Sequence, residues 1–450
     1  MDLLQDLYRL RDHEKKTREE ILSRQQVLLN RLLQYVREHS PYYKKIFEEN
    51  GITEDPDGNF ELTRLPVMEK ETFMAHFDEI LTVRDVTQAM LRRFDEQSPQ
   101  KEQELPGGYH VVHSSGSTGQ PQYFLYDRPA WERMLAGIVR GALWGMSGLQ
   151  IAGLLAGGIR ILYIAAAEGR YGGVLSIGDG VRGLGGEYRA LDIGRPLSDW
   201  QQVITEYRPN VLIGYPSALK IFAGLLRDGA VSCRLKRVIS CGEPLSPVLR
   251  AELEARLSLP VINFYGAGES LAMGVEVRPE EGMILFDDMN LIECRDGEIL
   301  LTCLYNYAQP VIRYRLHDSL SLIEPDTYPA FTRARGRVFR EEDLLWFPNE
   351  AGHPEFIHPL AVEGFQLEGL KDYQFLQTGP DSLHMLAEVP VAAQRQQIGR
   401  ILQERMEGIL REKHLRNIHF AIRFTDRILP DPKTGKKKLV LTEEKRGFCL

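Results

Sequence analysis

The first fifty residues carry apolar side chains at helical spacing. On one face these side chains recur at Leu28, Leu29, Leu32, Leu33 and Val36, with polar residues between them. A stripe of this period is typical of an amphipathic helix that packs against a core. We therefore predict helices up to about Glu49, interrupted at Ser40 and Pro41.

From about residue 109 the pattern changes to short apolar runs that alternate with helical stretches. The strand-like runs are YHVVH, IRILYIAAA, NVLIGY, LKRVISC and LPVINFY. Helical patterns cover Ala130–Met146, Ala218–Leu226 and Pro247–Leu257, and Gly297–Leu304 adds a further strand. Strands that alternate with helices predict an α/β fold, with mainly parallel sheets flanked by helices in a large N-terminal domain.

An apolar stretch runs from Gly145 to Ala167, but Arg160 and several glycines interrupt it. Short strand-like runs fit this stretch better than a membrane span. The first twenty residues are too charged to contain the apolar middle of a signal peptide. We therefore expect a soluble protein with no membrane partner.

Charged residues dominate positions 335–343, RGRVFREED, and the pattern changes again beyond them. A hairpin-like pair is followed by a long helix and a strand, at Tyr373–Gln377, Leu383–Glu388, Ala393–His414 and Ile418–Phe424. This order predicts a small α+β domain of ordinary size. We divide the chain into an N-terminal domain (1–336), a hinge (337–343) and a small, mobile C-terminal domain (344–450).

The composition excludes some classes of function. The 450 residues carry a formal net charge of -8, whereas a nucleic-acid-binding domain is normally basic, so we expect no nucleic-acid partner. Five cysteines without a CxxC pair indicate reduced thiols and a cytoplasmic location.

Two glycine-rich segments could bind phosphates. HSSGSTGQP at 113–121 offers backbone amides and hydroxyls to an anion, although it lacks the lysine of a Walker loop. A solvated Ser/Gly turn is the alternative for this loop taken alone. GDGVRG at 178–183 matches the dinucleotide pattern but no clear helix follows it, so we interpret it as a pocket loop or a turn.

Three further motifs carry chemistry that a nucleotide site needs. Tyr265 and Glu269 follow a strand-like run, where ligands gather in α/β sheets, and could stack on a base and hold Mg²⁺. A core tyrosine and a helix-capping glutamate are the alternatives. Asp318 in RYRLHDS could bind ribose hydroxyls, and PDPKTGKKK at 430–438 could bring a lysine to a phosphate.

The order of these motifs is more specific than any one of them. The series SSGSTG, GEP, YGAGES, YRLHD, GR…EED and KTGK resembles the adenylate-forming superfamily of acyl-CoA ligases, peptide-synthetase adenylation domains and luciferases. The helical start, the SPYY turn and the LTRLPVMEKETF stretch resemble its phenylacetate–CoA ligase branch.

The resemblance implies a role for each matching residue. Lys436 and Glu269 would be catalytic, with Glu269 also binding Mg²⁺, and Asp343 would be the hinge residue, although Glu342 is an alternative register. The contacts to ATP would come from Ser114, Ser115, Gly116, Ser117, Thr118, Gly119, Gly242, Glu243, Pro244, Tyr265, Gly266, Asp318 and Arg337. Tyr265 would stack on the adenine, beside a wall formed by residues 242–244, and Asp318 would bind the ribose.

The acid pocket is expected to combine small and aromatic residues that suit a flat aryl acid. Its members would be Tyr163, Tyr215, Pro216, Gly242, Gly266, Ala267 and Gly268. Two departures from the superfamily are visible: Gln122 occupies a position where many members have lysine, and residues 274–290 lack the Cys and His of a zinc site. We therefore expect no zinc.

The implied reaction is ATP-dependent activation of a small, aromatic carboxylic acid to an acyl-adenylate, with release of pyrophosphate and transfer to CoA. The alternative is an enzyme that passes the activated group to an amine, a carrier protein or another nucleophile. A nucleotide-binding protein without catalysis is a third reading, and a homodimer stays open. ATP, Mg²⁺ and CoA are the expected cofactors and co-substrates.

Overall fold

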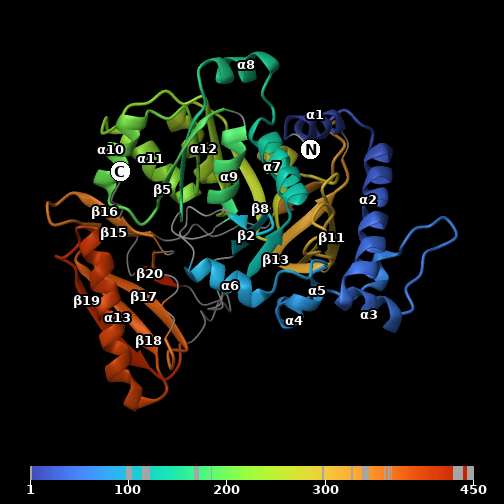
Figure 1. Ribbon diagram of the computed structural model, residues 1–450. Coiled ribbons are helices and arrows are strands. Elements are labelled where there is room, and N and C mark those ends of the chain that lie inside the picture. The colour runs from blue at the N-terminus through green and yellow to red at the C-terminus, as the bar shows by residue number, and fades with distance from the viewer. Residues whose placement is uncertain are drawn as a thin grey trace.

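The computed structural model describes residues 3–97, 104–113, 122–166, 172–183, 185–295, 298–325, 328–336, 344–358, 361–362, 365, 367–428 and 439–442. A large α/β body contains the N-terminal part of the chain, and a smaller sheet with one long helix contains the C-terminal part (Figure 1). The predicted fold class is confirmed at this level.

The helical N-terminus is present as predicted. It consists of α1 (Leu3–His13), α2 (Arg18–His39) and α3 (Pro41–Glu49), followed by η1 (Leu62–Arg64), α4 (Lys70–Ala75), α5 (Phe77–Ile80) and α6 (Gln88–Gln97). Thr17 and Glu20 begin α2 with a capping box, in which each side chain accepts a hydrogen bond from the backbone of the other residue. Ser40 ends α2 and caps α3, with Pro41 in the first turn.

Within the described residues, eleven strands form the central sheet in the order β11-β12-β13-β14-β10-β9-β8-β7-β6-β4-β5. In chain order these are β4 (Arg160–Ala165), β5 (Glu187–Asp192), β6 (Val211–Gly214), β7 (Arg237–Cys241), β8 (Val261–Ala267), β9 (Ser270–Glu276), β10 (Met283–Leu285), β11 (Asn290–Arg295), β12 (Glu298–Cys303), β13 (Tyr314–Ile323) and β14 (Arg333–Gly336). Neighbours from β5 to β8 are parallel, as predicted, and those from β8 to β11 are antiparallel.

Helices cover both faces of the parallel part. They are α7 (Arg128–Ala142), α9 (Gly172–Gly183), α10 (Leu197–Tyr207), α11 (Pro216–Arg227) and α12 (Pro247–Leu257). Helix α8 (Gly148–Ala156) lies away from these faces (Figure 1), and the short η2 (Pro279–Glu281) belongs to the antiparallel part. Leu162 and Ile164 of β4 pack with α10 and α11, whereas Ile161 and Tyr163 pack on the opposite face with α7. A small sheet of β1 (Glu104–Leu105), β2 (Tyr109–His113) and β3 (Tyr123–Tyr126) precedes α7.

Two of our local expectations were wrong. The GDGVRG segment, interpreted as a loop or turn, lies in α9, which packs against α7 and β5. Helix α8 occupies part of the apolar stretch where we expected strands only. Ser147 and Gln150 begin it with a capping box, which an apolar pattern alone does not reveal.

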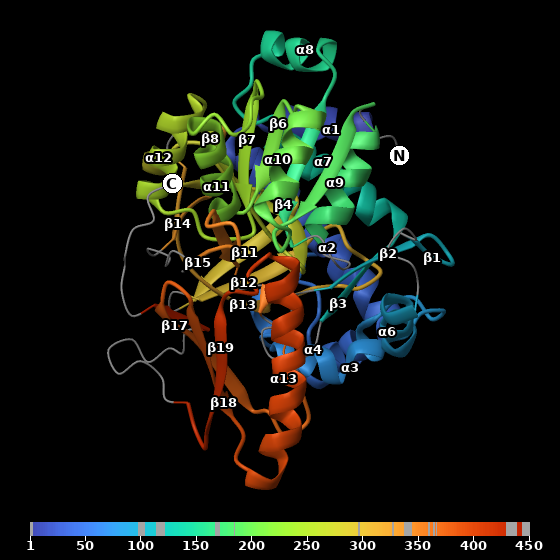
Figure 2. The ribbon, with the colours of Figure 1, turned by 90° about the vertical axis from the view of Figure 1, so that its left-hand side faces the viewer.

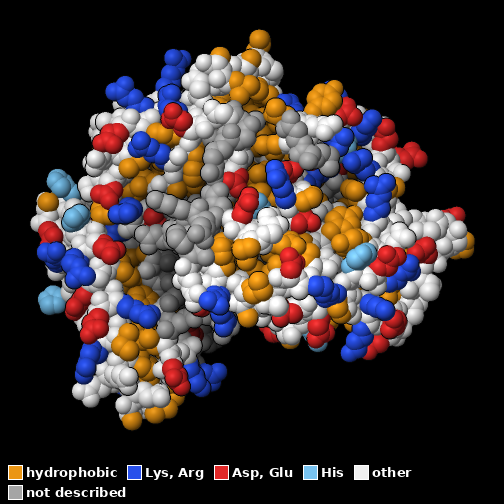
Figure 3. Space-filling model, in the orientation of Figure 1, with side chains coloured by type: hydrophobic (Ala, Val, Ile, Leu, Met, Phe, Trp, Pro, Cys, Tyr) orange, Lys and Arg blue, Asp and Glu red, His pale blue; other side chains and the backbone are white. Residues whose placement is uncertain are grey.

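Helix α8 projects from the top of the body in both ribbon views (Figures 1 and 2). Its side chains are mostly apolar, Leu149 is 88% exposed, and hydrophobic atoms are visible at the top of the molecule (Figure 3). Even so, no described helix combines the length and the apolar character that crossing a membrane requires.

The C-terminal part begins with a two-stranded hairpin and continues into a four-stranded sheet. Its elements are β15 (Leu345–Pro348), β16 (Pro354–Ile357), β17 (Asp372–Gly379), β18 (Ser382–Glu388), α13 (Ala392–Glu412), β19 (His419–Thr425) and β20 (Val440–Thr442). Buried residues from Leu345 to Val440 form a hydrophobic cluster of their own. The predicted hinge, 337–343, lies outside the described residues, so the domain boundary stays a prediction.

A buried ion pair fixes α1 to the body. Asp288 accepts hydrogen bonds from both terminal nitrogens of Arg140, at 2.7 and 3.0 Å, and lies 2.6 Å from Nδ1 of His13. Burial alone would raise the pKa of Asp288, but Arg140 and His13 hold it well below its usual range. Arg140 also donates to the carbonyl of Leu10 and lies over the Phe286 ring, 4.1 Å from its centroid.

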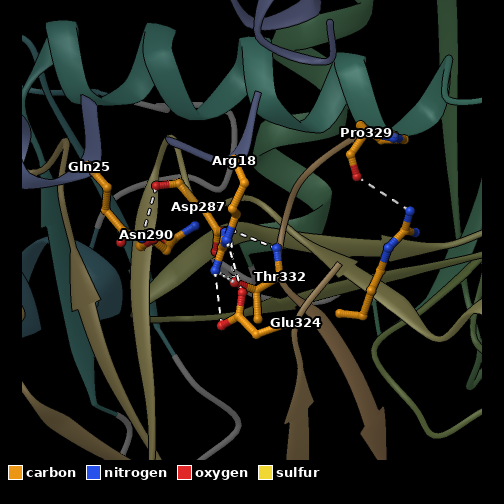
Figure 4. A network of polar contacts seen from close by, with 8 residues as sticks. Arg18, Gln25, Asp287, Asn290, Glu324, Pro329 and Thr332 are labelled. Carbon is orange, nitrogen blue, oxygen red and sulfur yellow. Dashed lines mark hydrogen bonds and ion pairs between the residues drawn. The ribbon is translucent and has the colours of Figure 1, made fainter. Parts of the chain in front are cut away.

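A neighbouring polar network fixes α2 (Figure 4). Arg18 donates to Asp287 at 2.6 Å and to Thr332 at 2.9 Å, while Gln25 donates to the carbonyl of Asn290 at 2.8 Å. Both helices are therefore held to the same loop, which leads from β10 into β11.

We expect Asp288→Ala to destabilise the chain by roughly 3–5 kcal/mol, because it leaves the buried Arg140 guanidinium without its carboxylate. Urea unfolding would measure the loss. The matched control is Arg128→Met, since Arg128 is paired with Glu132 but its side chain is 78% exposed, and such a pair is worth about 1 kcal/mol or less. Equal losses in the two variants would contradict the anchoring role of Asp288.

Candidate active site

Several predicted site residues stand at one edge of the parallel sheet. In the register of β4, β6, β7 and β8, Ile164 is beside Gly214, Gly214 is beside Ser240, and Cys241 is beside Phe264. The chain therefore leaves β6 and β7 at adjacent points, where Tyr215 and Gly242 follow, and Tyr265 stands at the same level of β8. Carboxyl ends of parallel strands are where α/β folds bind ligands.

Tyr265 and Asp318 are hydrogen-bonded to each other. The tyrosine hydroxyl donates to Oδ2 of Asp318 at 2.7 Å, although the two residues come from β8 and β13. Burial, followed by the Asp318 charge, raises the pKa of Tyr265 well above its ordinary value, so the hydroxyl keeps its proton. An aromatic ring and a carboxylate from separate strands are thus held side by side.

Glu269 lies in the tight turn between β8 and β9, next to this pair. Burial raises its pKa to about 7, and the charge of Asp318 contributes in the same direction. A hydrogen bond from Tyr314 and the charge of Lys70 act in the opposite direction. A carboxylate that is costly to ionise and has a second carboxylate nearby is suited to a cation.

Gln122 and Lys70 extend the group around Glu269. Gln122 is buried and its Nε2 donates to the Tyr314 hydroxyl at 2.9 Å, so the polar residue found in place of lysine has a defined partner. Lys70 begins α4, and the preceding Met68 makes two backbone hydrogen bonds beside β13. We did not predict Lys70, because a lysine in VMEK has no sequence feature that separates it from a surface lysine.

Glu243 was expected to wall the adenine site and is held by two other elements. It accepts from the backbone amide of Ser217 at 3.2 Å and from the Ser217 hydroxyl at 2.8 Å. Nε2 of His358, from beyond the predicted hinge, lies 2.8 Å from the other carboxylate oxygen. We did not predict His358, because no motif in the sequence marks it.

The residues expected to form the acid pocket are held by close packing and hydrogen bonds. Tyr163 is buried and hydrogen-bonded to Cys241, whose pKa burial raises to about 12, so the thiol keeps its proton. Gly242 has a φ of +77°, and a Cβ at this position would lie 2.5 Å from the Tyr215 ring. Residue 242 must therefore be glycine if the ring is to keep this position. Pro216 is buried in the first turn of α11, and the Gly268 carbonyl accepts from Tyr126 at 2.9 Å.

Other predicted residues lie outside the described parts of the chain. These are Ser114, Ser115, Gly116, Ser117, Thr118 and Gly119 of the phosphate loop, together with Arg337, Asp343 and Lys436. Among the described residues, no group of three or more His, Cys, Asp or Glu side chains could hold a metal ion.

The amino-acid sequence is similar to those of phenylacetate–coenzyme A ligases. No protein-family model matches the chain. It is 26% identical over 394 residues to a phenylacetate–coenzyme A ligase from Aromatoleum evansii, and the alignment covers 80% of each protein. The enzyme of the same name from Escherichia coli (strain K12) is 26% identical over 344 residues, which are 70% of this chain and 69% of that protein.

Solved structures agree on the fold. A structure of 2-hydroxyisobutyryl-CoA ligase in complex with 2-HIB-AMP and CoA aligns with 94% of this chain and 89% of its own, at a TM-score of 0.56 and 18% identity. The resemblance expected from the order of the motifs is confirmed by these relatives.

Glu269→Gln should stabilise the chain in a pH-dependent way. The folded-state pKa of about 7 lies above the ordinary 4.5, so the ionisation penalty is absent below pH 4.5 and complete above pH 7. With chelator present and no nucleotide, we expect the variant to melt like the wild type at pH 4. At pH 8 it should be more stable, by on the order of 1–3 kcal/mol.

Thermal unfolding at both pH values measures this difference. Glu280→Gln is the matched control, because Glu280 is exposed and its replacement should change neither melting curve. A Glu269→Gln variant that gains nothing at pH 8 would show that burial does not oppose ionisation of Glu269.

Proposed function

We propose that this chain, which is similar to the phenylacetate–coenzyme A ligases and has the fold of acyl-CoA ligases, activates a small carboxylic acid with ATP and transfers it to CoA. The observation that supports this most directly is the Tyr265–Asp318 pair beside Glu269 at one sheet edge. Three residue types with complementary roles toward a nucleotide meet there, from two strands and a turn.

In this proposal Tyr265 stacks on the adenine and its hydroxyl orients Asp318 toward the ribose. Gly242, Glu243 and Pro244 form the wall beside the base, with Gly266 at the strand end. Ser114–Gly119 and Arg337 contact the phosphates and ribose, as the resemblance implies. Glu269 holds Mg²⁺, which would neutralise phosphate charge during the reaction. A single protein carboxylate fits this ion, because Mg²⁺ keeps waters and substrate phosphates as its other ligands.

Adenylation needs no general base. The carboxylate of the acid is already a nucleophile at neutral pH, and its oxygen attacks the α-phosphorus while pyrophosphate leaves. What the protein must supply is alignment of the reacting atoms and positive charge at the phosphates. We assign the second task to Lys436 and, from its effect on Glu269, to Lys70 as an additional cation near the site.

The acid would be flat and small. Tyr163, Tyr215, Pro216, Gly242, Gly266, Ala267 and Gly268 combine aromatic faces with close backbone contacts, and this combination supports an aromatic acid. A cytoplasmic location and a homodimer stay predictions from the sequence, as do the absence of zinc and of a nucleic-acid partner.

We expect Lys436→Ala to lose on the order of 10²–10³-fold of adenylation while ATP binding is retained, because the lysine acts on charge that develops during the reaction. Acid-dependent exchange of pyrophosphate into ATP measures the first quantity, and calorimetry with ATP the second. Lys438→Ala, from the same lysine cluster, is the matched control and should retain activity. Near-normal exchange in Lys436→Ala would refute its assignment.

The acceptor and the hinge are tested together. With aryl acids, ATP and CoA, we expect a CoA thioester, and Asp343→Pro should reduce its formation more than it reduces pyrophosphate exchange, because proline restricts a hinge. Glu342→Pro tests the alternative hinge register: if it, rather than Asp343→Pro, loses thioester formation selectively, Glu342 is the hinge residue. Release of free adenylate by the wild type would favour a different acceptor, and equal loss of both steps would contradict the hinge role.

A further inference from the structure

His358 links the C-terminal hairpin to two loops at the edge of the parallel sheet. It follows β16, is fully buried, and its Nε2 lies 2.8 Å from Oε1 of Glu243 and 3.2 Å from the hydroxyl of Ser217. Because a carboxylate only accepts hydrogen bonds, Nε2 carries the proton and donates it to Glu243. None of the roles assigned above involves this histidine.

Glu243 takes the place of a missing helix cap. Helix α11 begins at Pro216 after Tyr215, whose side chain makes no capping hydrogen bond. The Glu243 carboxylate accepts from the Ser217 amide instead, so a negative charge lies at the positive end of the helix. Its position depends on three donors, two from Ser217 and one from His358.

Tyr215 is held by the same group. Its ring stacks against the His358 imidazole, with centroids 6.0 Å apart and planes at 30°, and it also contacts the backbone of Gly242. His358 thus touches both the side chain that follows β6 and the carboxylate that follows β7. These are two of the residues proposed to line the acid and adenine sites.

The hairpin that carries His358 belongs to two hydrophobic cores. Leu345 and Ile357 pack in the C-terminal core, whereas Phe356 packs against Trp200 of α10. Since residues alternate between the two faces of a strand, Phe356 and His358 point to the same side, toward the N-terminal body. The contact with Glu243 therefore exists only while this hairpin is docked there.

We infer that His358 is a positioning residue for acid binding: it holds Glu243 and Tyr215 in place, so that the acid-binding wall is complete when the C-terminal hairpin is docked. The inference rests on the proposed function, in which Tyr215 and Gly242 line the acid. Among the proposed ATP contacts, His358 touches Glu243 but neither Tyr265 nor Asp318, so its loss should weaken binding of the acid more than binding of ATP.

Two substitutions separate the roles of the ring and the donor. His358→Phe keeps a ring beside Tyr215 and removes the hydrogen bond to Glu243, whereas His358→Gln places an amide donor near the position of Nε2. In pyrophosphate exchange we expect His358→Phe to raise the KM for the acid about tenfold, the usual effect of losing one hydrogen bond to a charged group. The KM for ATP should stay within about twofold.

The KM of His358→Gln for the acid should lie closer to the wild-type value than the KM of His358→Phe does. His353→Phe is the matched control, because His353 is an exposed histidine of the same hairpin and its replacement should change neither KM. Equal impairment of the Gln and Phe variants, an unchanged KM for the acid, or an equal rise in both KM values would overturn the inference.

A second measurement does not depend on catalysis. Hydrogen exchange in a peptide that contains Ser217 should be faster in His358→Phe than in the wild type, because the amide of Ser217 donates to the carboxylate that His358 holds. If the wild type exchanges no pyrophosphate with any acid, the proposed function fails and amide exchange still decides the positioning role. Unchanged exchange at Ser217 would overturn that role.

Discussion

The backbone hydrogen bonds between four parallel strands determine where the candidate site lies in this protein. Strands β4, β6, β7 and β8 are in a register that brings their carboxyl ends to one edge. Each connection leaves the sheet at that edge, so the side chains that follow are close to one another without a dedicated binding domain. Tyr215, Gly242 and Tyr265 are neighbours for this reason, although fifty residues separate the first from the last.

The polar groups at this edge are stable because each has a partner from another element. Asp318 pairs with Tyr265, Glu243 with Ser217 and His358, and Glu269 with Tyr314. An unpartnered carboxylate in such surroundings would cost several kcal/mol, so the partners are a condition of the arrangement. The antiparallel half of the sheet supplies two of them, since Asp318 and Tyr314 both come from β13. That half is therefore part of the site as well as of the scaffold.

Local patterns in the sequence were sufficient to predict most helices and strands but not the long-range contacts between them. The runs NVLIGY and LKRVISC became β6 and β7, since a buried parallel strand has a nearly continuous apolar sequence. Helix α8 was missed because the capping box that begins it is not visible in an apolar pattern, and α9 was missed because its glycines made the segment look like a loop. The order of motifs placed Asp318 and Tyr265 in one site. His358 could not be found this way, because it contacts a residue more than a hundred positions away and PEFIHP has the pattern of an ordinary strand end.

The hairpin of β15 and β16 shows how one short element can couple two cores. Strand alternation gives it two apolar faces, with Ile357 in the C-terminal core and Phe356 in the N-terminal body. Glu355 accepts from the amide of Leu197 at the start of α10, at 2.9 Å, and Lys413 at the end of α13 donates to the carbonyl of Arg195 at 2.7 Å. Burial lowers the pKa of Lys413 to about 8, so keeping its ammonium group charged in this contact costs free energy. Burying this charge at the interface costs desolvation energy, and the ammonium group would regain water if the interface opened. The position of Glu243 and Tyr215 then depends on whether the C-terminal part is docked.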